Sequence, residues 1–261
     1  MEEDQVVARL RAAGCVFAEE EARLLGEAAR TPAGLEAMVG QREKGLPLEQ
    51  VVGWADFCGL RIFVDPGVFV PRRRSEFLVA TAVSLASGAS PVIVDLCCGT
   101  GALGLAVAAR LAAAGRAAGL HAADIDPAAG GCARRNVEPA GGRVYQGDLF
   151  APLPAELRGR VTVLICNAPY VPTGDIALLP PEARDYEPRT ALDGGSDGLA
   201  VLRRAAAEAP RWLAPGGVLL VETSDPQAPL MTRVMTAAGL TGRVHRCAEY
   251  ESTVVTGTAP G

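Results

Sequence analysis

The feature that most constrains the fold is the alternation of short apolar runs with alanine-rich segments from residue 91 onward. The run "PVIVDL" is continuously apolar, as in a strand that is covered on both faces, and "GLHAADI" and "VTVLICN" predict further strands. Segments of helical length follow them, the first being "GALGLAVAARLAA". Repeated strand–helix units predict a doubly wound α/β domain. The final segments "GRVHRCAEY" and "STVVTGT" predict a hairpin that ends the sheet.

The residues before this domain, 1–71, have a different pattern. Apolar residues at helical spacing predict short helices over residues 1–45, and Thr31 followed by Pro32 is a good helix start. In residues 46–71, the runs "WADF", "LRIFV" and "VFV" predict short strands. We expect the last two of these to be joined through the "DPG" turn.

Composition excludes several classes of protein. The 261 residues allow either one large domain or a domain with a small appendage. The net charge of −5 disfavours a sequence-independent nucleic-acid binder. No apolar run is long enough to span a membrane, and the acidic start lacks the layout of a signal peptide, so we expect a cytoplasmic protein. The seven cysteines form no C-x-x-C pair and there are only two histidines, so we expect no metal site.

A glycine loop follows the first strand of the α/β domain in the stretch "VDLCCGTGALG". Alone, this pattern also fits an ordinary tight turn. Acids end the first three strands, at Asp95, Asp124 and Asp148, where ligands of such sheets bind. Each acid could instead cap the next helix, a role that suits Asp126 better than Asp124. A dinucleotide site is the other alternative, although the full G-x-G-x-x-G is missing.

These acids and the loop resemble the S-adenosylmethionine site of class I methyltransferases. The resemblance implies a Rossmann-like sheet with helices on both faces, and S-adenosylmethionine as the cofactor, with S-adenosyl-L-homocysteine as the product. Cys97 stands where the family usually has its first glycine. The cofactor contacts implied by the resemblance are Asp95, Cys97, Gly99, Thr100, Gly101, Asp124, Ile125, Asp148, Leu149 and Asn167.

The fourth strand of the domain ends in "CNAPY", which places Asn167, Ala168, Pro169 and Tyr170 on the same rim. This stretch resembles the Asn-Pro-Pro-Tyr motif of methyltransferases that act on planar nitrogens. The Asn167 side-chain oxygen and the carbonyl of Ala168 can each accept one N–H of a flat amide or amine, and Tyr170 can stack on it. We interpret these four residues as catalytic, the alternative being an Asn-Pro turn after a strand.

The flanking segments resemble the protein glutamine-N5 methyltransferases of the HemK/PrmC group. "GWADFCGLRIFVDPGVFVPRRRSE" is similar to the hairpin linker of that family, and "DYEPRTALDGGSDGL" to a later segment of it. The resemblance implies a small helical substrate-recognition domain over 1–50, a β-hairpin linker over 51–74 and a methyltransferase domain over 75–261. It also implies substrate contacts at Arg72, Ser75, Glu76 and Glu187. Ala168 departs from the first proline of the motif, and Ser75 from a threonine.

The sequence therefore predicts an enzyme that methylates the side-chain nitrogen of a glutamine in a protein, with a peptide-chain release factor as the candidate partner. Two alternatives stay open. One is N-methylation of adenine in nucleic acid or of a small-molecule amine, and the other is a non-catalytic module that binds S-adenosylmethionine.

Overall fold

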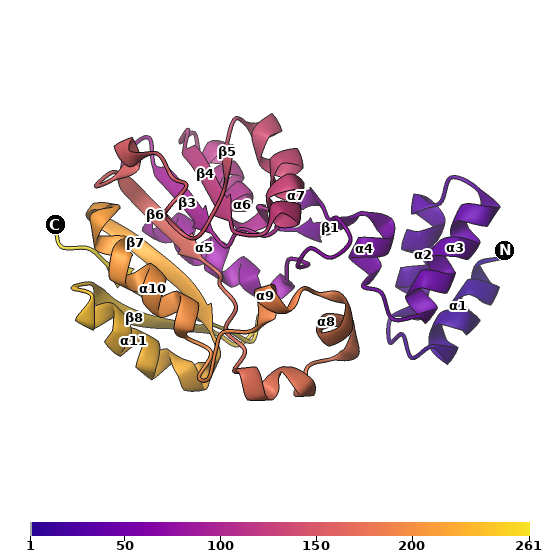
Figure 1. Ribbon diagram of the computed structural model, residues 1–261. Coiled ribbons are helices and arrows are strands. Elements are labelled where there is room, and N and C mark those ends of the chain that lie inside the picture. The colour runs from indigo at the N-terminus through magenta and orange to yellow at the C-terminus, as the bar shows by residue number, and fades with distance from the viewer. Residues whose placement is uncertain (1) are drawn as a thin grey trace.

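A computed structural model describes residues 2–261, and its centre is a seven-stranded sheet in the order β5-β4-β3-β6-β7-β9-β8 (Figure 1). Strands β3 to β7 are parallel, while β9 pairs antiparallel with both β7 and β8. The strands are β3 (Val92–Leu96), β4 (Gly119–Asp124), β5 (Arg143–Gln146), β6 (Val161–Cys166), β7 (Leu213–Thr223), β8 (Thr241–Cys247) and β9 (Ser252–Thr258). The doubly wound α/β fold and the terminal hairpin are thus confirmed.

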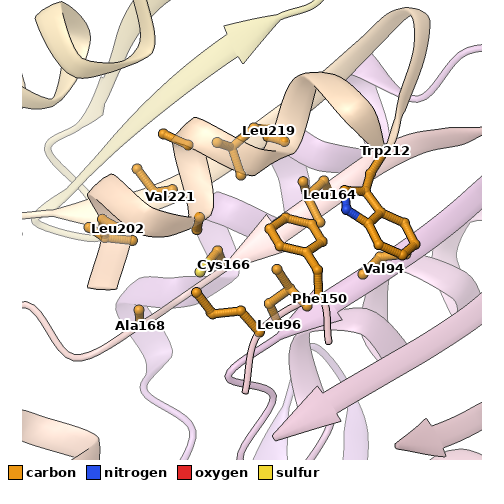
Figure 2. Packing of buried hydrophobic residues seen from close by; sticks show 14 of the residues in the cluster. Val94, Leu96, Phe150, Leu164, Cys166, Ala168, Leu202, Trp212, Leu219 and Val221 are labelled. Carbon is orange, nitrogen blue, oxygen red and sulfur yellow. The ribbon is translucent and has the colours of Figure 1, made fainter. Parts of the chain in front are cut away.

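Helices cover both faces of this sheet because alternate side chains of each inner strand point to opposite sides. On β3, Ile93 packs in one buried cluster with α5, α6 and α7, while Val94 packs in another with α10 and α11. Figure 2 shows the second cluster, in which Trp212 lies beside Phe150 and Leu164. These helices are α5 (Glu76–Leu85), α6 (Ala102–Ala113), α7 (Pro127–Val137), α10 (Ala200–Glu208) and α11 (Ala228–Ala237).

The N-terminal helices form a separate small body at one end of the molecule (Figure 1). They are α1 (Glu3–Ala12), α2 (Ala18–Ala28), α3 (Pro32–Glu43) and α4 (Leu48–Val52). Their own core includes Leu10, Leu25 and Val39, each fully buried. Thr31 caps α3 as expected, since its side chain accepts from the backbone of Gly34. No helix within residues 2–261 has the length and apolarity needed to cross a membrane.

Buried Arg42 ties this helical body to the rest of the chain. Its Nε lies 2.7 Å from Glu21, and Nη2 lies 3.0 Å from Glu182 in the distant helix α8 (Pro181–Tyr186). Tyr186 of the same helix donates from its hydroxyl to the backbone of Lys44. Helix α8 therefore connects the N-terminal helices to the segment that follows β6.

The region from 46 to 71 differs in two respects from the prediction. Residues 48–52 are helical, and the predicted strand "VFV" is wrong, because residues 68–70 pair with no strand. Side chains satisfy their backbone instead: Gln50 donates to the carbonyl of Val68 at 3.1 Å, and Glu187 accepts from the N–H of Val70 at 3.1 Å.

The hairpin is consequently made of β1 (Trp54–Phe57) and β2 (Leu60–Phe63), joined through Cys58 and Gly59 rather than through "DPG". Both turn residues have positive φ, 54° and 77°, as a two-residue turn between twisted strands requires. The remaining short elements are η1 (Arg73–Ser75), η2 (Glu138–Ala140), η3 (Ala155–Leu157), η4 (Thr173–Leu178), α9 (Arg189–Leu192), η5 (Ala209–Arg211) and η6 (Asp225–Gln227).

Candidate active site

A cavity of about 510 Å³ opens where the carboxyl ends of β3, β4 and β6 meet. Its volume is in the range of pockets that hold small molecules and cofactors. Its walls are formed by the linker residues 68–75, the glycine loop and the segment 179–192. The predicted site residues that line it are Arg72, Ser75, Cys97, Gly99, Thr100, Asp124, Ile125, Asn167, Ala168, Pro169, Tyr170 and Glu187.

The glycine loop turns through left-handed backbone at Cys97, Gly99 and Gly101, with φ of 54°, 55° and 78°. A side chain on Gly101 would meet Val137 at 2.6 Å, so this glycine lets α6 pack on α7. A side chain on Gly99 would meet nothing within 4 Å, because this position faces open space. Cys97 adopts backbone angles that favour glycine, which accounts for the residue expected there from the resemblance.

Asp124 holds the loop and also lines the cavity. Its Oδ2 accepts from the N–H of Gly99 at 2.8 Å, and its Oδ1 from the N–H of Asp126 at 2.9 Å. Burial raises the pKa of this carboxyl. Asp126 caps α7 instead, accepting from Ala128 at 2.8 Å, so the assignment of the cap to Asp126 is confirmed. Asp124 therefore accepts from two backbone N–H groups and also lines the cavity.

Five other predicted residues do not line the cavity. Asp95 is fully buried behind the loop, where its Oδ2 accepts from the N–H of Gly104 at 2.8 Å. Asp148 lines a neighbouring groove and pairs with Arg204 of α10 at 2.5 Å. Glu76 accepts from the N–H of Cys58 at 3.2 Å and so supports the hairpin turn. The five are Asp95, Gly101, Asp148, Leu149 and Glu76.

The buried carboxyl of Asp95 should make stability depend on pH. Burial raises the pKa of Asp95 to about 7, above the value of about 3.9 in an unfolded chain. Between pH of about 3.9 and about 7, the folded protein therefore binds a proton at Asp95 that the unfolded chain has lost. The free energy of unfolding consequently falls as pH rises through this range. We expect urea unfolding of the ligand-free protein near pH 5, 6 and 7 to show this slope. In Asp95→Asn the slope should be smaller by up to about 1.4 kcal/mol per pH unit. Equal slopes in both proteins would contradict the assignment.

Two hydrogen-bond acceptors without partners follow β6, in residues that line the cavity. Oδ1 of Asn167 is buried and has no partner among residues 2–261. The carbonyl of Ala168 likewise accepts no hydrogen bond within the described chain. Ala168 is 2 % exposed and belongs, with Cys166, to the buried cluster of Figure 2, which anchors this turn. Two neighbouring free acceptors suit a group that carries two N–H bonds.

The segment "DGGSDG" supports this turn by close backbone approach. A side chain on Gly194 would lie 2.7 Å from the carbonyl oxygen of Pro169, and one on Gly198 would overlap the carbonyl of Tyr170. Gly198 also has a φ of 77°. In the sequence this segment is visible only as part of the family resemblance, and its contact with the "NAPY" motif was not predicted.

Glu187 joins the opposite wall of the cavity to the linker. Its Oε1 lies 2.6 Å from Arg72 and also accepts from the backbone of Val70. Burial raises the pKa of this carboxyl, against the lowering effect of Arg72. Oε2 of Glu187 is buried without a partner in residues 2–261. Two predicted substrate contacts, Arg72 and Glu187, therefore form one unit at the edge of the cavity.

Comparison with known proteins gives consistent results. Residues 59–178 match a family model described as "Methyltransferase small domain". The chain is 39% identical to the release factor glutamine methyltransferase of Geobacter sulfurreducens, over 79% of this chain and 71% of that protein. It is 36% identical to 4-amino-L-phenylalanine/4-methylamino-L-phenylalanine methyltransferase of Streptomyces pristinaespiralis, over 74% and 66%. Among solved structures, a Pyrococcus furiosus methyltransferase matches its fold with a TM-score of 0.56 at 15% identity, over 87% of this chain and 98% of that one.

Proposed function

This chain belongs to the release factor glutamine methyltransferase family, and we propose that its acceptor is the side-chain amide nitrogen, N5, of a glutamine in a peptide-chain release factor. The enzyme is a methyltransferase that uses S-adenosylmethionine and acts on a protein. Membership of the family supports the release factor as the partner. The chemistry of the cavity supports the glutamine.

The observation that carries the proposal is the pair of free acceptors at Asn167 and Ala168. A buried acceptor without a partner costs free energy, so Oδ1 of Asn167 is expected to gain its partner from a ligand. A primary amide carries two N–H bonds on one planar nitrogen, one for each acceptor. Tyr170 lines the same cavity and offers an aromatic face to the flat amide.

The cavity also fits the cofactor. Gly99 faces open space, Asp124 presents a carboxylate to hydroxyl donors, and Ile125 is exposed beside it. We propose that Asp124 and Ile125 contact the ribose and adenine end of the cofactor, and that Cys97, Gly99 and Thr100 of the loop contact its methionine end. When bound, S-adenosylmethionine supplies an electrophilic methyl group attached to a positively charged sulfur.

The residues of the chain then orient the acceptor. Asn167 and the carbonyl of Ala168 accept the two N–H bonds and so fix the plane of the amide. Both oxygens carry partial negative charge, which stabilises the positive charge that develops on the nitrogen during transfer. The Arg72–Glu187 unit is proposed to contact the peptide at the edge of the cavity.

Methyl transfer to purified release factors and to a whole-proteome extract, read by peptide mass, tests the function. Label on a release-factor glutamine is the expected result, and a release factor with that glutamine changed to glutamate is the control. Label on a glutamine of another protein would keep the chemistry and change the partner. Label only on nucleic acid or on a small amine would contradict the glutamine assignment.

A small aromatic amine is the second candidate acceptor. The relative from Streptomyces pristinaespiralis is named for such a substrate, and an aryl amine also carries two N–H bonds on a planar nitrogen. Adding 4-amino-L-phenylalanine to the same assay distinguishes the two acceptors. Faster turnover of this amine than of the release factor would favour the second candidate.

Asp124→Ala should weaken cofactor binding. The change removes a carboxylate that both holds Gly99 and faces the cavity, and loss of a buried hydrogen-bond partner costs about 1–3 kcal/mol. Calorimetric titration with S-adenosylmethionine measures the change, and unchanged affinity would refute the proposed ribose contact. The same titration of Asp148→Ala tests the cofactor contact that the resemblance implies for Asp148: weaker binding would support it and unchanged affinity would contradict it.

A further inference from the structure

Tyr170 forms a closed triad with Arg74 and Glu222 at the cavity wall. The Tyr170 hydroxyl donates to Oε1 of Glu222 at 3.2 Å, and Nε of Arg74 lies 2.9 Å from the same oxygen. Another nitrogen of Arg74 donates to the Tyr170 hydroxyl. The Arg74 guanidinium also lies 5.6 Å from the centre of the tyrosine ring. Each member of the triad therefore contacts the other two.

The burial of Glu222 is unusual for a purely structural residue. It is 2 % exposed near the end of β7, and its Oε2 is buried without a partner among residues 2–261. A packed apolar side chain would cost less folding free energy at such a position, because a buried carboxylate loses its hydration. Arg74 and Tyr170 line the cavity, whereas Glu222 does not. Glu222 can therefore influence an acceptor only through these two neighbours.

The backbone of Tyr170 is held from the same strand end. Nε2 of Gln227 donates to the carbonyl of Tyr170 at 2.8 Å and to that of Asp197 at 3.0 Å. Gln227 follows the end of β7 by a few residues, and Glu222 is the second-last residue of that strand. Both the phenol and the carbonyl of Tyr170 are thus fixed, which leaves its ring one orientation at the cavity.

We propose that Glu222 is a positioning residue for methyl transfer, holding Arg74 and the ring of Tyr170 in the orientation that shapes the acceptor pocket. The proposal rests on the function proposed above. It extends the site to β7, whose residues were not predicted to take part. The missed signal is the one used for the first three strands, an acid at the carboxyl end of a strand.

Glu222→Gln keeps the size of the side chain and removes its charge. We expect kcat to fall by about 10-fold to 100-fold, the effect of losing a charge-assisted hydrogen bond, while affinity for S-adenosylmethionine stays the same. In a background that carries both Arg74→Met and Tyr170→Phe, Glu222→Gln should have little further effect, because both groups that Glu222 holds are gone. An effect of Glu222→Gln as large in that background as in the wild type would overturn the proposal.

Asp225→Asn is the matched control, since this nearby acid pairs with Arg246 at 2.6 Å outside the cavity. Its kcat should be unchanged. If the wild type labels a different acceptor, the variants are compared on that acceptor. Failure of the release-factor assignment can therefore be distinguished from failure of the proposed role of Glu222.

A titration of tyrosinate absorbance tests the triad without any acceptor. Burial, and next to it the Glu222 carboxylate, raise the pKa of Tyr170 well above its ordinary value. Glu222→Gln should lower that pKa, read as the difference from Tyr170→Phe. An unchanged titration would overturn the triad even if no methyl transfer were found.

Discussion

Asn167→Ala should lower kcat for methyl transfer by about 10²–10³ while S-adenosylmethionine still binds. The substitution removes the buried, unpartnered Oδ1 that is proposed to accept one N–H of the acceptor amide. Losing it costs both the orientation of the nitrogen and the stabilisation of its developing positive charge. Single-turnover kinetics with saturating cofactor measure the chemical step directly.

Thr173→Ala is the matched control for Asn167→Ala. Thr173 is exposed on the same segment after β6, does not line the cavity, and donates to Asp193 at 2.6 Å. Its single-turnover rate should stay close to that of the wild type. A near-normal rate for Asn167→Ala would mean that "NAPY" serves only as a turn.

Gly198→Ala is expected to lower kcat/KM by about 10² or more, because displacing a positioned group by about 1 Å has an effect of that size. An added Cβ would overlap both the carbonyl of Tyr170 and Nε2 of Gln227, so the motif must move. The left-handed backbone at φ 77° adds strain of about 1–2 kcal/mol. Activity assays and urea unfolding together separate the two effects.

Gly216→Ala isolates the strain from the overlap. Gly216 has a φ of 71° but an added Cβ there would meet nothing within 4 Å. We expect it to lose similar stability to backbone strain and to keep its activity. If Gly216→Ala and Gly198→Ala lost activity equally, the contact between Gly198 and the motif would not be the cause.

The sequence by itself determined the parts of the fold that depend on neighbouring residues. Apolar runs and helical spacing placed the strands and helices of the α/β domain, because burial on both faces leaves a local pattern. Acids and the "NAPY" motif at strand ends indicated the rim where a ligand binds, since parallel strands end at one edge. Thr31 and Asp126 signalled helix starts through equally local hydrogen bonds.

Local pattern misled where distant groups satisfy the backbone. Val68 and Val70 are buried and have the composition of a strand, yet the carbonyl of Val68 bonds to the Gln50 side chain and the N–H of Val70 bonds to the Glu187 side chain. Glu187 is 117 positions away from Val70, which no periodicity over a short window can register. The hairpin therefore turns at Cys58 and Gly59.

Only the tertiary structure decided which polar groups face the cavity. Asp95 and Asp124 both belong to the ends of inner strands, but Asp95 points behind the loop to Gly104 while Asp124 lines the cavity. The triad at Tyr170 includes Arg74, which is 96 positions earlier, and Glu222, which is 52 positions later. The physical reason is that orientation and long-range contact arise from packing of the whole sheet, whereas sequence pattern reports only burial and hydrogen bonding between near neighbours.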